Sequence, residues 1–395
     1  MSRYIKTLSH PIVARLSLIQ LISYFGTWFS QVAIFSLLVE LNAGPLVISM
    51  TAAMAMLPAV VLAPVIGIAV DRIPFKKLMG TLLSLEIAAT LGFMLIDSLS
   101  LVWLLMLLIF IRSAAASMLF SAEMTLFPKI IEGEMLKNTN EIHSIIWSFT
   151  YAAGMAVGGV ITYHFGYRAA FMTDAFLYTI ALLILMGLKL VLSLPEQTHS
   201  HWQMFLDGFA YLKSRKKLIH LILLHAALGL TSFDALVTLL ADYQYKTLIA
   251  VPLAIGWINA MRAIALMTGP FFIGKWIHNR NLHYFFILEG IAIIAWSLVQ
   301  HNFYWSLIAL FGVGFFTSTL WSQTYLMLQQ ETEKAYMGRI ISYNDMFFML
   351  SNITTALFIG YAYEWGLSLQ GITVALGIGF LITAVYYLWI RKRYL

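Results

Sequence analysis

Residues 46–77 read LVISMTAAMAMLPAVVLAPVIGIAVDRIPFKK, and this stretch decides the fold. Residues 46–70 carry no charged side chain. As an α-helix, a run of that length measures about 37 Å, which is enough to cross the roughly 30 Å hydrocarbon core of a bilayer. The charged residues that end the run are Asp71, Arg72, Lys76 and Lys77. The stretch therefore predicts a membrane-spanning helix that leaves the bilayer at a basic loop.

The composition extends this interpretation to the whole chain of 395 residues. Apolar residues make up 61% of it and charged residues only 11%, whereas about one quarter of an ordinary soluble domain is charged. There is no cysteine, which excludes disulfides and thiol chemistry. The net charge is +6, but the placement of the basic residues explains it better than a nucleic-acid partner does, and we expect none.

Twelve apolar stretches, each long enough to span a bilayer, follow one another along the chain. They lie at residues 16–40, 46–70, 78–97, 101–124, 142–163, 170–192, 218–241, 250–274, 283–300, 303–327, 340–362 and 369–390. We predict an all-α integral membrane fold of twelve transmembrane helices in two six-helix halves, residues 1–192 and 218–395. The polar residues 193–217 form a cytoplasmic linker, in which Trp202 to Leu212 fit a short amphipathic helix.

The basic residues fix the orientation. With a cytoplasmic N-terminus, twenty Lys and Arg residues fall in inside segments, and only Arg168 and Lys246 fall outside. Cytoplasmic segments are enriched in positive charge. An even number of helices then places both termini in the cytoplasm, and we expect a bacterial cytoplasmic (inner) membrane.

The two halves show weak internal similarity. Leu85-Glu86 matches Leu288-Glu289, and residues 117–121 (SMLFS) match residues 318–322 (STLWS) at offsets close to 200. Related halves are typical of transporters that rock about a site near the middle of the membrane.

Three motifs carry a resemblance to a known family. The loop with Gly67, Asp71, Arg72, Lys76 and Lys77 resembles the signature loop of the major facilitator superfamily, with Pro74 near where the family often has Gly. Arg112, followed by small residues, resembles the arginine motif of the family's fourth helix, which is linked to proton coupling. The antiporter glycine motif of the fifth helix is matched by Gly154, Gly158 and Gly159, although Met155 replaces the usual Pro.

Within that superfamily, several segments resemble the drug–proton antiporter branch that includes macrolide and siderophore exporters. They are residues 23–33, 171–178, 205–212 and 338–340. The resemblance implies proton-coupled export of small amphipathic organic molecules by alternating access, by a monomer in the lipid bilayer that is not an enzyme and holds no cofactor or metal. Thr27 stands where the branch often has Asp, so that acid's role does not transfer.

Ionisable residues at membrane depth are costly and mark function by default. Asp234 lies well inside residues 218–241 and could replace the acid missing at Thr27. A carboxyl group there could load and release a proton, or it could be a structural partner for an arginine. Arg262 lies among Ala, Leu and Met and needs an anion, which Asp234, Glu289 or a substrate could supply.

Other buried charges complete the candidate charge network. Arg112 is expected to neutralise Glu123 or Glu86, or to act in proton coupling. Glu86 and Glu289 are expected to pair between helices or to reach the membrane surface, and Asp345 could act in gating. Asp174 is expected to make a contact at the start of a helix.

Aromatic residues with a few polar ones predict a substrate cavity suited to amphipathic molecules. For any one aromatic residue, packing in the core or against lipid is the alternative. The cavity residues predicted are Tyr24, Trp28, Gln31, Trp147, Tyr151, Asp234, Trp257, Asn259, Trp321, Tyr325 and Phe348.

Competing functions stay open. The nearest are export of one natural ligand such as a siderophore, and lipid or lysophospholipid flipping. A metal-ion exporter is disfavoured because His143, His164 and His225 show no metal-binding spacing. The sequence lacks a phosphate-binding loop and a hydrolase motif, which disfavours direct ATP coupling and an intramembrane enzyme.

Overall fold

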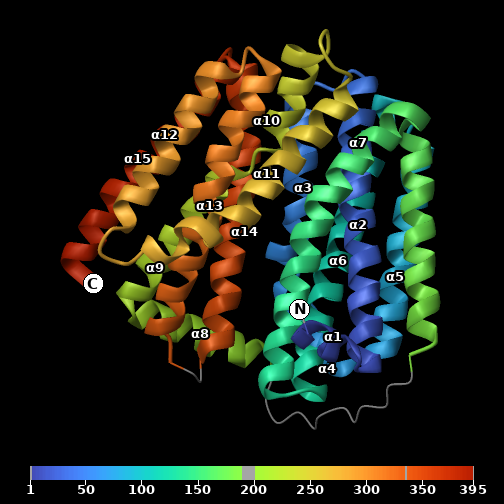
Figure 1. Ribbon diagram of the computed structural model, residues 1–395, viewed down its shortest axis with the longest axis vertical. Coiled ribbons are helices and arrows are strands. Elements are labelled where there is room, and N and C mark those ends of the chain that lie inside the picture. The colour runs from blue at the N-terminus through green and yellow to red at the C-terminus, as the bar shows by residue number, and fades with distance from the viewer. Residues whose placement is uncertain (1, 189–200, 334–335, 395) are drawn as a thin grey trace. The chain divides into compact units, whose positions relative to one another are not determined.

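The computed structural model describes residues 2–188, 201–333 and 336–394, and every regular element in these ranges is a helix (Figure 1). Ten of these helices are long and apolar enough to cross a membrane. The chain is therefore a multi-pass, all-helical membrane protein, as the sequence predicts.

Contacts divide the chain into two compact units. Unit 1 comprises residues 1–42 and 61–198. Its elements are α1 Ser2–Leu8, α2 Pro11–Glu40, α4 Ala63–Arg72, α5 Phe75–Gly92, η1 Phe93–Leu95, η2 Leu99–Leu101, α6 Val102–Ile130 and α7 Gly133–Met186.

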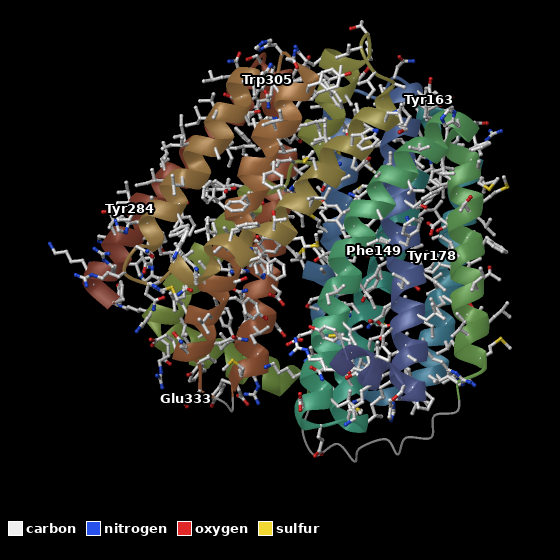
Figure 2. The ribbon with its side chains drawn as sticks, viewed as in Figure 1. Phe149, Tyr163, Tyr178, Tyr284, Trp305 and Glu333 are labelled. Atoms are coloured by element: carbon white, nitrogen blue, oxygen red, sulfur yellow. The ribbon has the colours of Figure 1, made fainter. Side chains whose placement is uncertain are left out.

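Unit 2 comprises residues 43–60 and 199–395. Its elements are α3 Pro45–Val61 (except for the last residue), α8 His201–Ser214, α9 Lys216–Ala226, η3 Ala227–Thr231, α10 Asp234–Leu239, η4 Leu240–Tyr245, α11 Val251–Ile273, η5 Gly274–Trp276, α12 Leu282–Val299, α13 Phe303–Glu331, α14 Met337–Glu364 and α15 Leu369–Tyr394. Trp305 and Glu333 lie at opposite ends of this unit (Figure 2).

Helix α7 is far longer than a single membrane crossing requires. Its 54 residues would measure about 80 Å as one straight helix. Gly166 interrupts it with non-helical backbone angles of φ 79° and ψ 165°. This positive φ is accessible to glycine at little cost. The sequence predicts two helices with an intervening turn here, and Gly166 lies within that turn.

The stretch from Lys216 to Tyr245 is broken, although the sequence predicts one helix over residues 218–241. Helix α9 tightens into the 3₁₀-helix η3, and the backbone leaves helical geometry at Ser232 with φ −74° and ψ 78°. Helix α10 then starts at Asp234 and passes into a π-helix. Interrupted helices within a membrane are tolerated where other groups bond the freed backbone.

The two units repeat the same pattern of neighbouring helices. In unit 1, α5 packs against α6 and α7, and α2 packs along α7. In unit 2, α12 packs against α13 and α15, and α9 and η3 pack against α14. The pairs α4–α6 and α11–α13 also correspond. Glu86 on α5 and Glu289 on α12 thus occupy equivalent helices, as their sequence similarity suggests.

Glycines allow α2 and α7 to approach closely. A Cβ atom on Gly154 would lie 2.9 Å from Trp28 Cβ, and one on Gly158 would lie 2.7 Å from the Phe29 carbonyl oxygen. Helix association in lipid depends on such close packing, because burial from lipid gains little of the energy that burial from water does. Gly159 is also buried. The predicted glycine motif thus lies at this helix contact.

Candidate functional site

A cluster of charged side chains is buried inside unit 1. Arg112 on α6 donates from Nε to Glu86 Oε2 on α5 (3.1 Å) and from Nη2 to Asp174 Oδ2 on α7 (2.7 Å). Both carboxyl side chains are fully buried, and the Arg112 side chain is 7% exposed. The predicted pairing of Arg112 with Glu86 is confirmed, and the helix-start contact expected for Asp174 is wrong.

Neutral groups surround this cluster. Ser30 on α2 donates a hydrogen bond to Asp174 Oδ2. The guanidinium carbon of Arg112 lies 5.7 Å from the ring centre of Phe93 and 5.9 Å from that of Tyr178, and Tyr178 lies within the helices of unit 1 (Figure 2). Gly26 leaves room for Asp174, since a Cβ atom there would overlap Asp174 Oδ1.

The charges of this cluster do not cancel. Two carboxylates against one guanidinium leave one negative charge when all three groups are ionised. A buried charge without a partner is expensive, so one proton shared between Glu86 and Asp174 would make the cluster neutral. The cluster can therefore brace three helices, and it also has the chemistry to hold a proton.

Unit 2 contains a second cluster with the same balance of charge. Arg262 on α11 interacts electrostatically with the carboxyl groups of Asp234 and Glu289. Its Nη2 donates to the Thr231 carbonyl oxygen (2.5 Å), and its Cζ lies 5.2 Å from the Phe233 ring centre. The Asp234 and Arg262 predicted from the sequence as charge partners are brought together.

The break after η3 explains this arrangement. The helix is interrupted between Thr231 and Asp234, and Arg262 donates to the Thr231 carbonyl at that point. Asp234 becomes the first residue of α10 and is partly exposed, whereas Glu289 is fully buried. Thr317 on α13 donates to Glu289 Oε1 (2.7 Å). Asp234 is thus the acid of this cluster that lies at the helix break.

The predicted cavity residues form an aromatic group in each unit. In unit 1, Trp28 lies against Trp147 and Tyr151, with ring centres 5.8 and 4.3 Å apart, and Gln31 is half-buried nearby in sequence. In unit 2, Trp321 lies against Phe348 (4.6 Å). The rings therefore gather within each unit. Tyr325 stacks on Trp321 with ring centres 6.4 Å apart, whereas Tyr24 lies against His143 at 5.8 Å.

Two predicted cavity residues on α11 behave differently. Asn259 is buried and donates from Nδ2 to the Ile255 carbonyl oxygen of its own helix (3.1 Å), whereas Trp257 is exposed. Asp345 on α14 is also exposed and accepts from Asn344 Nδ2 (3.3 Å).

The basic loop lies between α4 and α5. Lys76 donates to the carbonyl oxygens of Met186 (2.6 Å) and Leu188 (3.1 Å). These hydrogen bonds cap the C-terminal end of α7. Arg72 and Lys77 are exposed. The surroundings of Gly67 and the Asp71 side chain lie outside the described part of the structure. Lys76 thus ties the loop to α7.

Glu123 is the residue that the sequence undervalues. The sequence offers it only as one of two possible partners for Arg112, but it is buried within α6 and bonds to α2 instead. Asp174 was likewise undervalued. The available signal was the same for both, a carboxyl group inside an apolar run, but the sequence does not show which acid meets the arginine.

Comparisons with known proteins agree with this architecture. The family model described as Major Facilitator Superfamily matches residues 16–252, more than half of the chain. No curated protein sequence matches.

Solved transporter structures are similar in fold. A bacterial homologue of the human lysosomal transporter Spinster, inward-facing and occupied, has a TM-score of 0.77 at 13% identity, covering 97% of each chain. A bacterial homologue of the iron transporter ferroportin has a TM-score of 0.75 at 15% identity, covering 97% of this chain and 99% of that one. The nucleoside transporter NupG has a TM-score of 0.72 at 15% identity, with the same coverage.

Proposed function

Because the chain belongs to the major facilitator superfamily, we propose that it is a secondary active transporter that exports amphipathic organic molecules from the cytoplasm in exchange for protons. Alternating access of the halves 1–192 and 218–395, joined by the linker 193–217, would move the cargo. The proposed location is a bacterial inner membrane, with both termini in the cytoplasm.

The proposal includes twelve membrane crossings. Ten helices in the described residues meet the length and apolarity of a span. Two crossings within Gly133–Met186, separated at Gly166, would add one to that number. The apolar helix Pro45–Val61, continued by α4, would add the other. An even number agrees with the concentration of Lys and Arg in the segments assigned to the cytoplasm.

The observation that carries proton coupling is the placement of Asp234 and Arg262. Asp234 begins the helix that follows the break, and Arg262 acts on both Asp234 and Glu289. With one guanidinium between two carboxyl groups, a proton on Asp234 leaves a neutral cluster, and its loss leaves a negative one. A change of net charge at a helix break is suited to drive a change of conformation.

Transport in proteoliposomes tests this mechanism. With an imposed pH gradient, we expect ethidium and the neutral amphipath chloramphenicol to move against the proton gradient. Asp234→Asn should lower gradient-driven transport at least tenfold while leaving gradient-independent exchange of substrate measurable, because the amide retains shape and polarity but takes up no proton.

Asp242→Asn is the matched control. Asp242 lies eight positions later on the same interrupted helix and pairs with Lys246 at its end (3.1 Å). This variant should transport like the wild type. Asp234→Asn with intact transport and intact pH dependence would contradict the coupling role, and wild-type transport indifferent to the gradient would exclude proton antiport.

A further inference from the structure

Glu123 on α6 is a buried carboxyl group outside both charge clusters. Its side chain accepts hydrogen bonds at Oε2 from Gln20 Nε2 (2.9 Å) and Tyr24 Oη (3.3 Å), both on α2. The residue is only 2% exposed. Arg112 lies eleven residues earlier on the same helix, about 16 Å along its axis, and is bonded to Glu86 and Asp174.

The surroundings of Glu123 supply no compensating charge. Both of its hydrogen-bond donors are neutral, and within the described residues no ion pair includes it. A buried carboxylate needs a positive partner or a proton. The site is therefore built either to stay protonated or to receive a cation from outside the protein.

A histidine lies next to Tyr24, the tyrosine that donates to Glu123, and a phenylalanine lies next to that histidine. His143 on α7 meets the edge of Tyr24 with ring centres 5.8 Å apart and lies 5.4 Å from Phe120. Its side chain is largely buried, at 8% exposure for the residue. Its Nδ1 atom and the Gln20 Oε1 atom have no hydrogen-bond partner among the described residues. An unused amide oxygen thus lies on Gln20, which donates to Glu123, and an unused ring nitrogen lies on His143 beside Tyr24.

Unit 2 holds the same three kinds of residue at the three corresponding positions, but each position holds a different kind. The residues Tyr24, Glu123 and His143 are followed 201 or 202 positions later by His225, Tyr325 and Asp345. Each unit thus places one tyrosine, one acid and one histidine on three helices, which are α2, α6 and α7 in unit 1 and α9, α13 and α14 in unit 2, but in a permuted order.

Two aromatic residues of the same helices also recur at this offset. Phe120 and Trp147 correspond to Trp321 and Phe348, both 201 positions later. In unit 2, His225 lies 4.3 Å from Trp321 and 5.6 Å from Tyr325 between ring centres. Asp345 interacts electrostatically with Tyr325. The group of residues that occurs in both units is therefore an acid, a tyrosine and a histidine, with aromatic rings beside them.

We propose that Glu123, with Gln20, Tyr24, His143 and the adjoining rings, binds a lipophilic organic cation. The carboxylate supplies the charge, the aromatic faces favour a cation over a neutral molecule, and the unused Gln20 Oε1 suits a group that donates. When the cation leaves, a proton from water neutralises Glu123, so binding and protonation exclude each other. This inference rests on the proposed export function and names its cargo class.

Equilibrium binding of radiolabelled tetraphenylphosphonium to the purified full-length protein, without any gradient, tests the proposal. Wild-type protein should bind it more weakly as the pH falls. Glu123→Gln should weaken binding at least tenfold and remove the pH dependence. The amide oxygen can still accept from Gln20 and Tyr24, so the fold should survive, and gel filtration with a thermal melt checks this. Glu123→Asp should retain pH-dependent binding.

Glu132→Gln, which removes an exposed carboxyl group just beyond α6, is the matched control and should bind like the wild type. Wild-type affinity in a folded Glu123→Gln protein would overturn the proposal, and so would a wild-type protein that does not bind the cation. Gradient-driven transport of neutral chloramphenicol reports separately on the proposed function, so either idea can fail while the other holds.

Discussion

At the scale of single residues, the ratio of carboxyl groups to arginines in each charge cluster says more about its chemistry than any one acid does. Both clusters hold two carboxyl groups against one arginine. An ionisable side chain in an apolar run marks a candidate from the sequence alone, and Glu86, Arg112, Asp234, Arg262 and Glu289 were found that way. The pairing of Arg112 with Asp174 was not, because Asp174 lies 62 positions later on another helix, and only the packing of α7 decides that contact.

Arg112 should be required for stability because its removal leaves Glu86 and Asp174 buried without a cation. Breaking a buried charge pair costs about 3–5 kcal/mol, so Arg112→Met should lower the melting temperature strongly in a detergent-based unfolding assay. Adding Glu86→Gln and Asp174→Asn should recover part of the loss, because no buried charge then remains. Arg168→Met, at an exposed position, should melt like the wild type. A single Arg112→Met variant with an unchanged melting temperature would contradict this account.

At the scale of helices, apolar run length predicts where a span lies but not whether it is continuous. Residues 218–241 are apolar throughout most of their length, so their pattern predicts one helix. The break between Thr231 and Asp234 is stabilised by Arg262 on another helix, a contact with no local signal. Asp174 and Glu123 were misjudged for a related reason, since helix rotation sets which side chains meet.

The contact between α2 and α7 should not tolerate a side chain at Gly158. A Cβ atom there would lie 2.7 Å from the Phe29 carbonyl oxygen and 3.0 Å from Phe29 Cα, so the two backbones must separate. Overpacking of this kind costs about 1–3 kcal/mol, and Gly158→Ala should lower the melting temperature by several degrees, with Gly158→Leu lowering it further. Val157→Leu, at the exposed neighbouring position, is the control. Equal melting of all three variants would show that the helices are not in close contact.

At the scale of the whole molecule, the charge pattern and the helices make one combined prediction about topology. The sequence places Arg168 outside and the segments around Ser9 and Ser214 inside. The structure adds the non-helical Gly166 within α7, close to Arg168. If α7 crosses the membrane twice, its turn must face the side opposite to both of its ends. A single crossing by α7 would instead put its two ends on opposite sides of the membrane and reverse the orientation of every helix that follows.

The absence of cysteine makes this prediction directly measurable. Single variants Ser9→Cys, Ser100→Cys, Arg168→Cys and Ser214→Cys place a thiol at exposed positions. In intact cells, a membrane-impermeant maleimide should label residues 100 and 168, because both follow an odd number of crossings. It should label residues 9 and 214 only after permeabilisation, because these lie on the side rich in Lys and Arg. Labelling of residue 214 in intact cells would mean that α7 crosses once. Protection of residue 168 in intact cells, with labelling after permeabilisation, would place the Gly166 turn in the cytoplasm and reject the twelve-helix topology.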